Sequence, residues 1–208
     1  METLFAKVAL LLTGTMLMGA FGTLCGRRVQ SLGGLIALLV GFVLGTIAVI
    51  VAANINPVVG IILLMGWAYL SGLVIGPAVE MYSQKLGWQT VCGAFLGTAG
   101  VMAGCGAYGL LTTANLSGWG TYLGFGLFGL IIVGVIGIFV RMSRTVNIVY
   151  SLFGMVIFAG YFVFDFFRLG HSENTWAKAV ELTMSIYLDF LNFFLYLLQF
   201  LAAVSDKN

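Results

Sequence analysis

The last long apolar stretch of the chain, residues 177–204, contains the polar side chains best placed to do chemistry. Six of them recur at steps of four, four, three, four and three residues. We call them the polar seam: Glu181, Ser185, Asp189, Asn192, Tyr196 and Gln199. At roughly 100° per residue they fall within about 80° of arc on one face of a helix. Since a mid-membrane carboxylate that faces hydrocarbon is costly, the seam must face other helices or water.

A second carboxylate, Asp165, lies near the end of the preceding apolar stretch, residues 148–167. Asp165 is roughly 7 to 8 Å deep when measured from the turn at Gly170, and Asp189 is about 10 Å deep from the same side, at about 1.5 Å per residue. The connection between the two stretches is short, so the helices must be antiparallel neighbours. The sequence therefore predicts that Asp165 and Asp189 face each other.

Two facing carboxylates would form a site for a proton or a cation. Both cannot ionise cheaply in a low-dielectric environment, so the pair is expected to share a proton. A cation between them would remove that penalty, and Ca²⁺ prefers about six to eight oxygen ligands. Because Asp165 and Asp189 supply only part of that shell, they are predicted to be metal ligands of a weak Ca²⁺ site, which suits permeation better than storage.

Ordinary structural roles remain open for the same residues. Asp165 could pair with Arg168, one turn later, as an ion pair at a helix end. Asp189 could form a hydrogen bond within the bundle, either protonated or paired with a buried tyrosine. Glu80 and Glu181 lie near span ends, which favours carboxylates that are solvated at the membrane interface.

The composition is that of an integral, multi-pass membrane protein surrounded by a lipid bilayer. Hydrophobic residues make up 61% of the chain and charged residues 8%, whereas about a quarter of a soluble domain is charged. The net charge of +2 and the lack of a basic run argue against nucleic acid. The apolar runs are continuous rather than alternating, so a β-barrel is rejected.

The 208 residues leave room for about seven spans of roughly 20 to 25 residues. We predict an all-α fold, a bundle of seven transmembrane helices with the last helix central, as a single transmembrane domain over residues 1–208. The predicted spans are 5–25, 32–53, 58–81, 88–111, 121–140, 148–167 and 177–204.

Enzymatic chemistry has little support. His171 is the only histidine and lies in a turn, so neither a histidine-based metal site nor a catalytic triad can be built. The chain has no Walker motif and hence no sign of nucleotide-driven transport. We predict a protein that is not an enzyme and has no cofactor, with Ca²⁺ only as a bound or transported ion.

Several segments resemble one family. Residues 184–200, MSIYLDFLNFFLYLLQF, resemble the signature last helix of the Bax inhibitor-1 family, also called the transmembrane Bax inhibitor motif family. Residues 162–165, 71–77 and 112–117 resemble elements of its sixth helix, third helix and fourth loop. The pattern is similar to that of the bacterial YetJ-type members, which implies the bacterial inner membrane.

The resemblance implies a pH-sensitive calcium leak channel, or an H⁺-coupled Ca²⁺ transporter, governed by Asp165 and Asp189. It also implies an alternative: a membrane-embedded interaction protein that modulates a stress, cell-death or membrane-protease pathway, with protein partners that the sequence does not identify. Relatives often have an arginine where this chain has Gln199, and an acidic residue in the second helix where this chain has none. A salt-bridge latch built from those positions is therefore absent or replaced.

Overall fold

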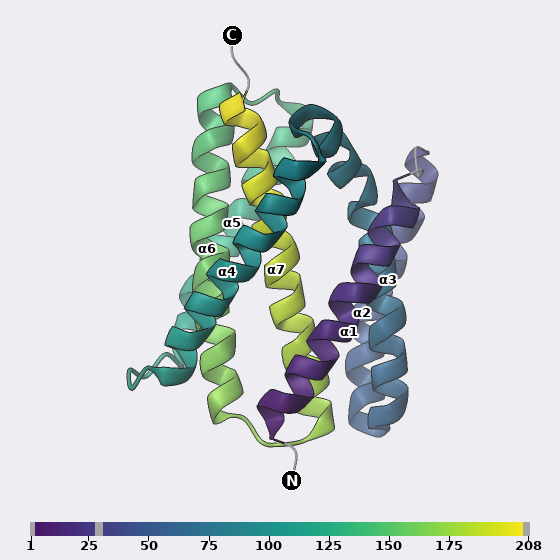
Figure 1. The fold of residues 1–208 in the computed structure, drawn as a ribbon, viewed down its shortest axis with the longest axis vertical. Coiled ribbons are helices and arrows are strands. Elements are labelled where there is room, and N and C mark those ends of the chain that lie inside the picture. Colours follow the sequence, from purple (N-terminus) through teal and green to yellow (C-terminus); the bar gives the residue numbers. More distant parts are fainter. Residues whose placement is uncertain (1–2, 28–30, 206–208) are drawn as a thin grey trace. The chain divides into compact units, whose positions relative to one another are not determined.

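The computed structural model of the protein describes residues 3–27 and 31–205 (Figure 1). Within these residues it contains seven helices, each long and apolar enough to cross a membrane, and no strand. They are α1 (Leu4–Gly26), α2 (Leu32–Ile55), α3 (Pro57–Leu86), α4 (Trp88–Leu111), α5 (Trp119–Phe139), α6 (Arg144–His171) and α7 (Trp176–Ser205). The predicted all-α fold with seven transmembrane helices is confirmed.

The helices form two compact units. The first contains α1, α2, α3 up to Met81 and α7 up to Tyr187. The second contains the end of α3, α4, α5, almost all of α6, and α7 from Leu188 onward. The seventh helix therefore contributes to both units, with residues 176–187 (its first half) in the first and residues 188–205 (its second half) in the second.

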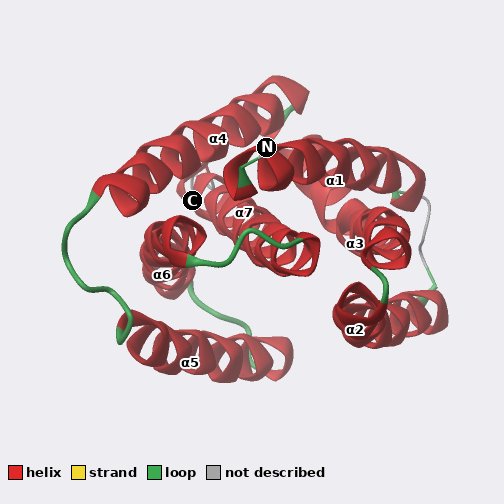
Figure 2. Ribbon diagram, turned by 90° about the horizontal axis from the view of Figure 1, so that it is seen from below, coloured by secondary structure: helices red, strands yellow, loops and turns green. Residues whose placement is uncertain are grey.

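In the first unit, α3 packs closely against α1 because glycines replace larger side chains at the contact. A Cβ atom on Gly22 of α1 would meet the backbone carbonyl of Tyr69, and one on Gly72 of α3 would meet that of Gly19. Small residues let helix backbones approach in this way within a membrane. On the other side, α2 lies beside α3 (Figure 2), and Trp67 Nε1 donates a hydrogen bond of 3.0 Å to a threonine hydroxyl of α2.

In the second unit, α6 contacts α4, α5 and α7. A Cβ atom on Gly109 of α4 would meet the backbone of α6, and one on Gly126 of α5 would meet a side chain of α6. Phe162 of α6 and Phe193 of α7 pack with ring centroids 5.8 Å apart. These contacts fix the antiparallel pairing of α6 and α7 that positions the predicted site.

Several helices, α6 and α7 among them, extend beyond the apolar spans predicted from hydropathy. The sixth helix begins at Arg144 and the seventh ends at Ser205, because polar residues in contact with water or headgroups can continue a helix past the hydrocarbon. At the start of α7, Thr175 Oγ1 accepts a hydrogen bond of 3.1 Å from the Lys178 amide. Thr175 is therefore the N-cap, as its position before the apolar stretch indicates.

Burial differs strongly between helices. In the most apolar 18 residues of α7, 39% of the residues are buried, whereas the corresponding share in α2 is 6%. Val180, Leu182, Ile186 and Leu198 have no exposed surface. The second helix thus has few fully buried side chains, whereas α7 is the most extensively buried of the described helices.

Candidate functional site

The second unit brings Asp165 of α6 and Asp189 of α7 together. Their exposed fractions are only 1% and 6%. The Asp189 carboxyl lies within hydrogen-bonding reach of the Asp165 carboxyl. The two side chains meet because the short connection makes α6 and α7 antiparallel, and because the phenylalanines between the helices hold them in contact.

A cation lies beside this pair of carboxyl groups. Arg168 Nη1 donates a hydrogen bond of 3.1 Å to Asp165 Oδ1, one turn away on the same helix. The field of the guanidinium also reaches Asp189. Asp165 therefore has both of the neighbours that its position in the sequence suggested, an arginine on its own helix and a carboxyl group on the next.

The Asp189 carboxyl group has one buried oxygen without a hydrogen-bond donor among the described residues. Its Oδ2 atom is buried, and no N–H or O–H group in the described part of the chain donates to it. A buried carboxylate oxygen that has lost its water is costly to leave without compensation. A proton shared with Asp165, or a bound cation, would supply that compensation.

Sequence reasoning missed Tyr161, which also lies in the electrostatic field of both carboxyl groups. Tyr161 precedes Asp165 by four residues, so the two share a face of α6. This i, i+4 spacing was the signal that could have found it. A phenolic hydroxyl near the pair is a further group able to donate a hydrogen bond.

Two other members of the polar seam bind partners on α6. The Tyr196 and Tyr150 hydroxyl groups form a hydrogen bond of 3.1 Å, and the Tyr150 hydroxyl also lies 3.0 Å from a backbone carbonyl oxygen of α5. Nearer the end of α7, Gln199 Nε2 donates to Asn147 Oδ1 at 3.3 Å. Gln199 and Asn147 therefore form a neutral amide pair between α7 and α6.

The remaining members of the polar seam form hydrogen bonds within α7 itself or are partly exposed. Glu181 accepts a hydrogen bond of 2.8 Å from Lys178 Nζ, and its side chain is 41% exposed. Asn192 Nδ2 donates to the Leu188 carbonyl oxygen at 2.8 Å. Ser185 is half-buried. The seam is thus not one continuous site, because its members have different partners.

A buried hydroxyl network lies in the first unit, away from the seam. Tyr187 has no exposed surface, and its hydroxyl lies 2.7 Å from Ser71 Oγ and 3.3 Å from the Ala68 carbonyl oxygen. Tyr187 departs from the seam in sequence, and a buried phenol off that face must find its own partner. This network fastens the first half of α7 to α3.

The donor set limits the metals that the pair could hold. Within the described residues, no group of three or more histidine, cysteine, aspartate or glutamate side chains is arranged to hold a metal ion. A hard cation at Asp165 and Asp189 would complete its shell with water or carbonyl oxygens. Such a donor set fits a passing ion better than a resident one.

Comparison with known proteins identifies relatives in bacteria, animals and viruses. An uncharacterized protein of Borreliella burgdorferi is 34% identical over 143 residues, which cover 65% of this chain and 60% of that protein. Protein lifeguard 4 of Mus musculus is 30% identical over 174 residues, covering 82% and 71%. The Golgi anti-apoptotic protein of vaccinia virus (strain Lister) is 33% identical over 146 residues, covering 70% and 59%.

The chain thus spans about three fifths of the length of the Borreliella relative. The family described as Inhibitor of apoptosis-promoting Bax1 matches residues 1–206, nearly the whole chain. This match confirms the resemblance to the Bax inhibitor-1 family, and the seven apolar helices fit an integral, multi-pass membrane protein. The protein belongs to the family of inhibitors of apoptosis-promoting Bax1, the Bax inhibitor-1 family.

Proposed function

We propose that the protein is a pH-sensitive calcium leak channel, or an H⁺-coupled Ca²⁺ transporter, in which Asp165 and Asp189 form the cation and proton site. The observation that carries the proposal is the meeting of two buried carboxyl groups on neighbouring membrane helices. Two such groups are expensive to ionise together, so their presence in an apolar chain favours a functional use.

Calcium is the favoured ion because of the ligand type. Carboxylate oxygens suit hard cations, and water molecules would supply the ligands that the two aspartates do not. A site with few protein ligands binds weakly, and weak binding allows an ion to leave as readily as it enters.

Protons should compete with Ca²⁺ for this site. When one carboxyl group is protonated, the pair can form a carboxyl–carboxylate hydrogen bond and needs no cation. When both are ionised, they repel each other until a cation enters. Lower pH should therefore weaken Ca²⁺ binding, and Ca²⁺ should favour release of the shared proton by the same coupling free energy.

Arg168 would moderate the affinity of the site. Its guanidinium binds Asp165 and places a positive charge near the position of the ion. We assign it the role of lowering Ca²⁺ affinity enough for exchange, and of substituting for the ion when the site is empty.

Flux measurements in liposomes would test the proposal. Purified protein should pass Ca²⁺ into liposomes, and Asp189→Asn should reduce that flux about tenfold or more, the effect of about 1.4 kcal/mol of lost interaction. The matched control is Glu181→Gln, an equivalent change on the same helix at a carboxylate that already has Lys178 as its partner. Equal flux in Asp189→Asn and wild type would remove Asp189 from the mechanism.

We also propose that α7 is the central helix of the bundle and that the protein lies in a bacterial inner membrane. The extensive burial of α7 supports the first statement, and the bacterial relatives support the second. Cysteines introduced at Asn192 and Tyr196 should react poorly with reagents dissolved in lipid. Ready labelling at both positions would mean that this face of α7 is open to the bilayer.

A second candidate function is favoured by the name of one relative and by the description of the family. The vaccinia protein is described as anti-apoptotic, and the family description refers to inhibition of an apoptosis-promoting protein. On this alternative, the chain acts by binding another membrane protein in a cell-death or stress pathway. Its activity would then survive Asp189→Asn, which distinguishes it from the transport function.

A further inference from the structure

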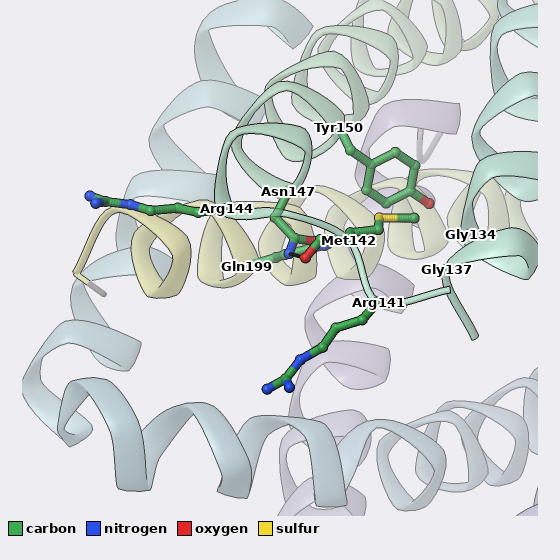
Figure 3. Close-up of a pocket in the computed structure, with 8 residues that line it drawn as sticks. All are labelled: Gly134, Gly137, Arg141, Met142, Arg144, Asn147, Tyr150 and Gln199. Carbon is green, nitrogen blue, oxygen red and sulfur yellow. Dashed lines mark hydrogen bonds between the residues drawn. The ribbon is translucent and has the colours of Figure 1, made fainter. Parts of the chain in front are cut away.

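A polar pocket of ≈ 530 Å³ lies in the second unit where α5 ends and α6 begins. The fifth helix ends at Phe139 and the sixth begins at Arg144, so the pocket lies at the ends of two membrane spans. Figure 3 shows Asn147, Gln199 and Met142 gathered beside one another in this pocket. Lipid headgroups occupy the corresponding level of a bilayer, just outside a hydrocarbon core about 30 Å thick.

The charged residues that line this pocket are both cationic. Arg144 donates hydrogen bonds of 3.0 Å from Nε and from Nη2 to the carbonyl oxygens of Ala203 and Val204. These carbonyl groups hold the guanidinium at the end of α7 without neutralising its charge. Arg141 is exposed and forms no hydrogen bond or ion pair with another described residue. Figure 3 shows the two guanidinium groups directed outward on different sides of the pocket.

An apolar groove of ≈ 350 Å³ shares Tyr150 with the polar pocket. Its other lining residues are Val133, Thr145, Val146, Val149 and Phe153. Val149 is 61% exposed and Phe153 is 49% exposed, so the groove opens toward lipid. Phe153 is nine residues beyond Arg144, or about 13 Å along α6, which approaches the length of an acyl chain in one leaflet of about 15 Å.

From these two adjoining features we infer that the end of α5 and α6 is a binding site for an anionic phospholipid. The phosphate group interacts with Arg141, Arg144 adds positive charge at the end of α7, and one acyl chain occupies the neighbouring groove. Arginine suits this role because its planar donors match the oxygens of a phosphate group. Basic pockets between transmembrane helices bind acidic headgroups on the same principle.

The continuity of the two features favours a lipid over a free anion. A free phosphate ion would use the polar pocket alone and would derive nothing from the groove. A phospholipid satisfies both, since its charged and apolar parts are joined at the membrane interface. The site is separate from the aspartates, because Arg144 precedes Asp165 by about six helical turns at about 3.6 residues per turn.

Native mass spectrometry of the purified full chain would test this inference. The probes are dioleoyl phosphatidylglycerol and dioleoyl phosphatidylcholine, which have identical acyl chains but differ in net headgroup charge. We expect about tenfold tighter binding of phosphatidylglycerol, as for one charge-assisted contact to phosphate, and a loss of that preference in Arg141→Gln. Arg141 has no partner among the described residues, so this variant should fold normally.

The matched control is Lys85→Gln, which removes one positive charge from the last turn of α3. The α3–α4 and α5–α6 connections lie at the same membrane face, because successive spans alternate in direction. This control should keep the wild-type preference. A loss equal to that in Arg141→Gln would show only a general effect of charge and would overturn the site.

Two further measurements distinguish binding of a whole phospholipid from binding of its headgroup alone. Val149→Trp should fill the groove and weaken phosphatidylglycerol binding several-fold. Soluble glycerol 1-phosphate should compete far less well than the intact lipid. The inference is overturned if the two phospholipids bind equally, if Val149→Trp has no effect, or if glycerol phosphate competes as strongly as the lipid, since the pocket would then be a simple anion site.

Discussion

The two halves of α7 each place a carboxylate of the polar seam in a different environment, one partly exposed and the other buried. Glu181, in the first unit, is 41% exposed and accepts a hydrogen bond from Lys178 on its own helix. Asp189, eight residues later in the second unit, is 6% exposed and meets another carboxyl group. Both belong to one seam with helical spacing. The spacing decides only that they share a face; solvent and the neighbouring side chains decide what each carboxylate can do.

The two halves also share a packing device. Tyr187 in the first unit lies against Gly19 of α1, and Tyr196 in the second lies against Gly154 of α6. In both cases the absence of a Cβ atom makes room for a phenol ring or its hydroxyl group. The hydrogen bonds then differ: Tyr187 bonds to Ser71, whereas Tyr196 bonds to Tyr150.

The largest expected effect is a loss of Ca²⁺ affinity when either member of the buried aspartate pair is replaced. In Asp165→Asn and in Asp189→Asn, Ca²⁺ affinity near neutral pH should fall about tenfold or more, because one of two ionisable ligands is lost. The wild-type affinity should rise with pH, since protons leave the site, and each variant should flatten that dependence. Isothermal titration calorimetry between about pH 5 and pH 8 would measure this.

Glu181→Gln provides the control for this experiment and should retain the wild-type pH profile. A wild-type profile in both asparagine variants would show that the pair does not sense protons.

The next largest effect is expected on stability, when a side chain is added at Gly154, which lies against Tyr196. In Gly154→Ala the new Cβ atom would lie 2.6 Å from ring atoms of Tyr196, a distance that requires the ring or the helices to shift. Overpacking of this kind costs about 1 to 3 kcal/mol, so thermal unfolding in detergent should occur at a lower temperature. Gly104→Ala on α4 is the matched control, because a Cβ atom there would meet nothing within 4 Å. Equal stability of the two variants would contradict the close contact.

Removal of the arginine beside the pair should act in the opposite direction. Arg168→Gln takes away a cation that competes with Ca²⁺, so affinity should rise about 3- to 10-fold, or about 0.7 to 1.4 kcal/mol. Lys178→Gln removes the corresponding cation beside Glu181 and should leave Ca²⁺ binding unchanged. A fall in affinity after Arg168→Gln would indicate that the arginine positions Asp165 rather than opposing the ion.

The hydroxyl network of the first half should make a smaller contribution. Tyr187→Phe deletes the hydrogen bond to Ser71 and should destabilise the protein by about 0.5 to 1.5 kcal/mol. Ser71 Oγ also donates to the Ala68 carbonyl oxygen at 2.7 Å, so it is not left without a partner. Chemical denaturation of the single and double Tyr187→Phe, Ser71→Ala variants would measure the coupling. Full additivity of the two changes would mean that the hydroxyl groups do not interact.

The smallest effect is expected at the exposed pair. Glu181→Gln should change stability by no more than about 0.5 kcal/mol, because solvent screens the interaction with Lys178. The same denaturation assay applies, at low and high salt. A loss comparable to that in Tyr187→Phe would show that this pair is less solvated than its exposure indicates.

The number and type of the helices could be predicted from sequence because lipid imposes a simple condition. Every backbone polar group in hydrocarbon must be satisfied within the chain, so each long apolar run becomes a helix. The sequence also predicts comparable depths for Asp165 and Asp189, since a short connection and a constant rise per residue set both distances. The proximity of Arg168 to Asp165 follows from the same local geometry.

Tertiary structure decided the partners. Asn192 lies on the seam but bonds to the carbonyl oxygen of Leu188 on its own helix, while Tyr187 lies off the seam and bonds to Ser71, 116 residues earlier. Contacts between helices in lipid depend on where small residues such as Gly19 and Gly154 allow close approach, and on how each helix is rotated about its axis. The periodicity of one helix gives neither the points of close approach nor the rotation of the helix about its axis. The sequence by itself therefore determined which side chains share a face, and packing between helices determined what that face contacts.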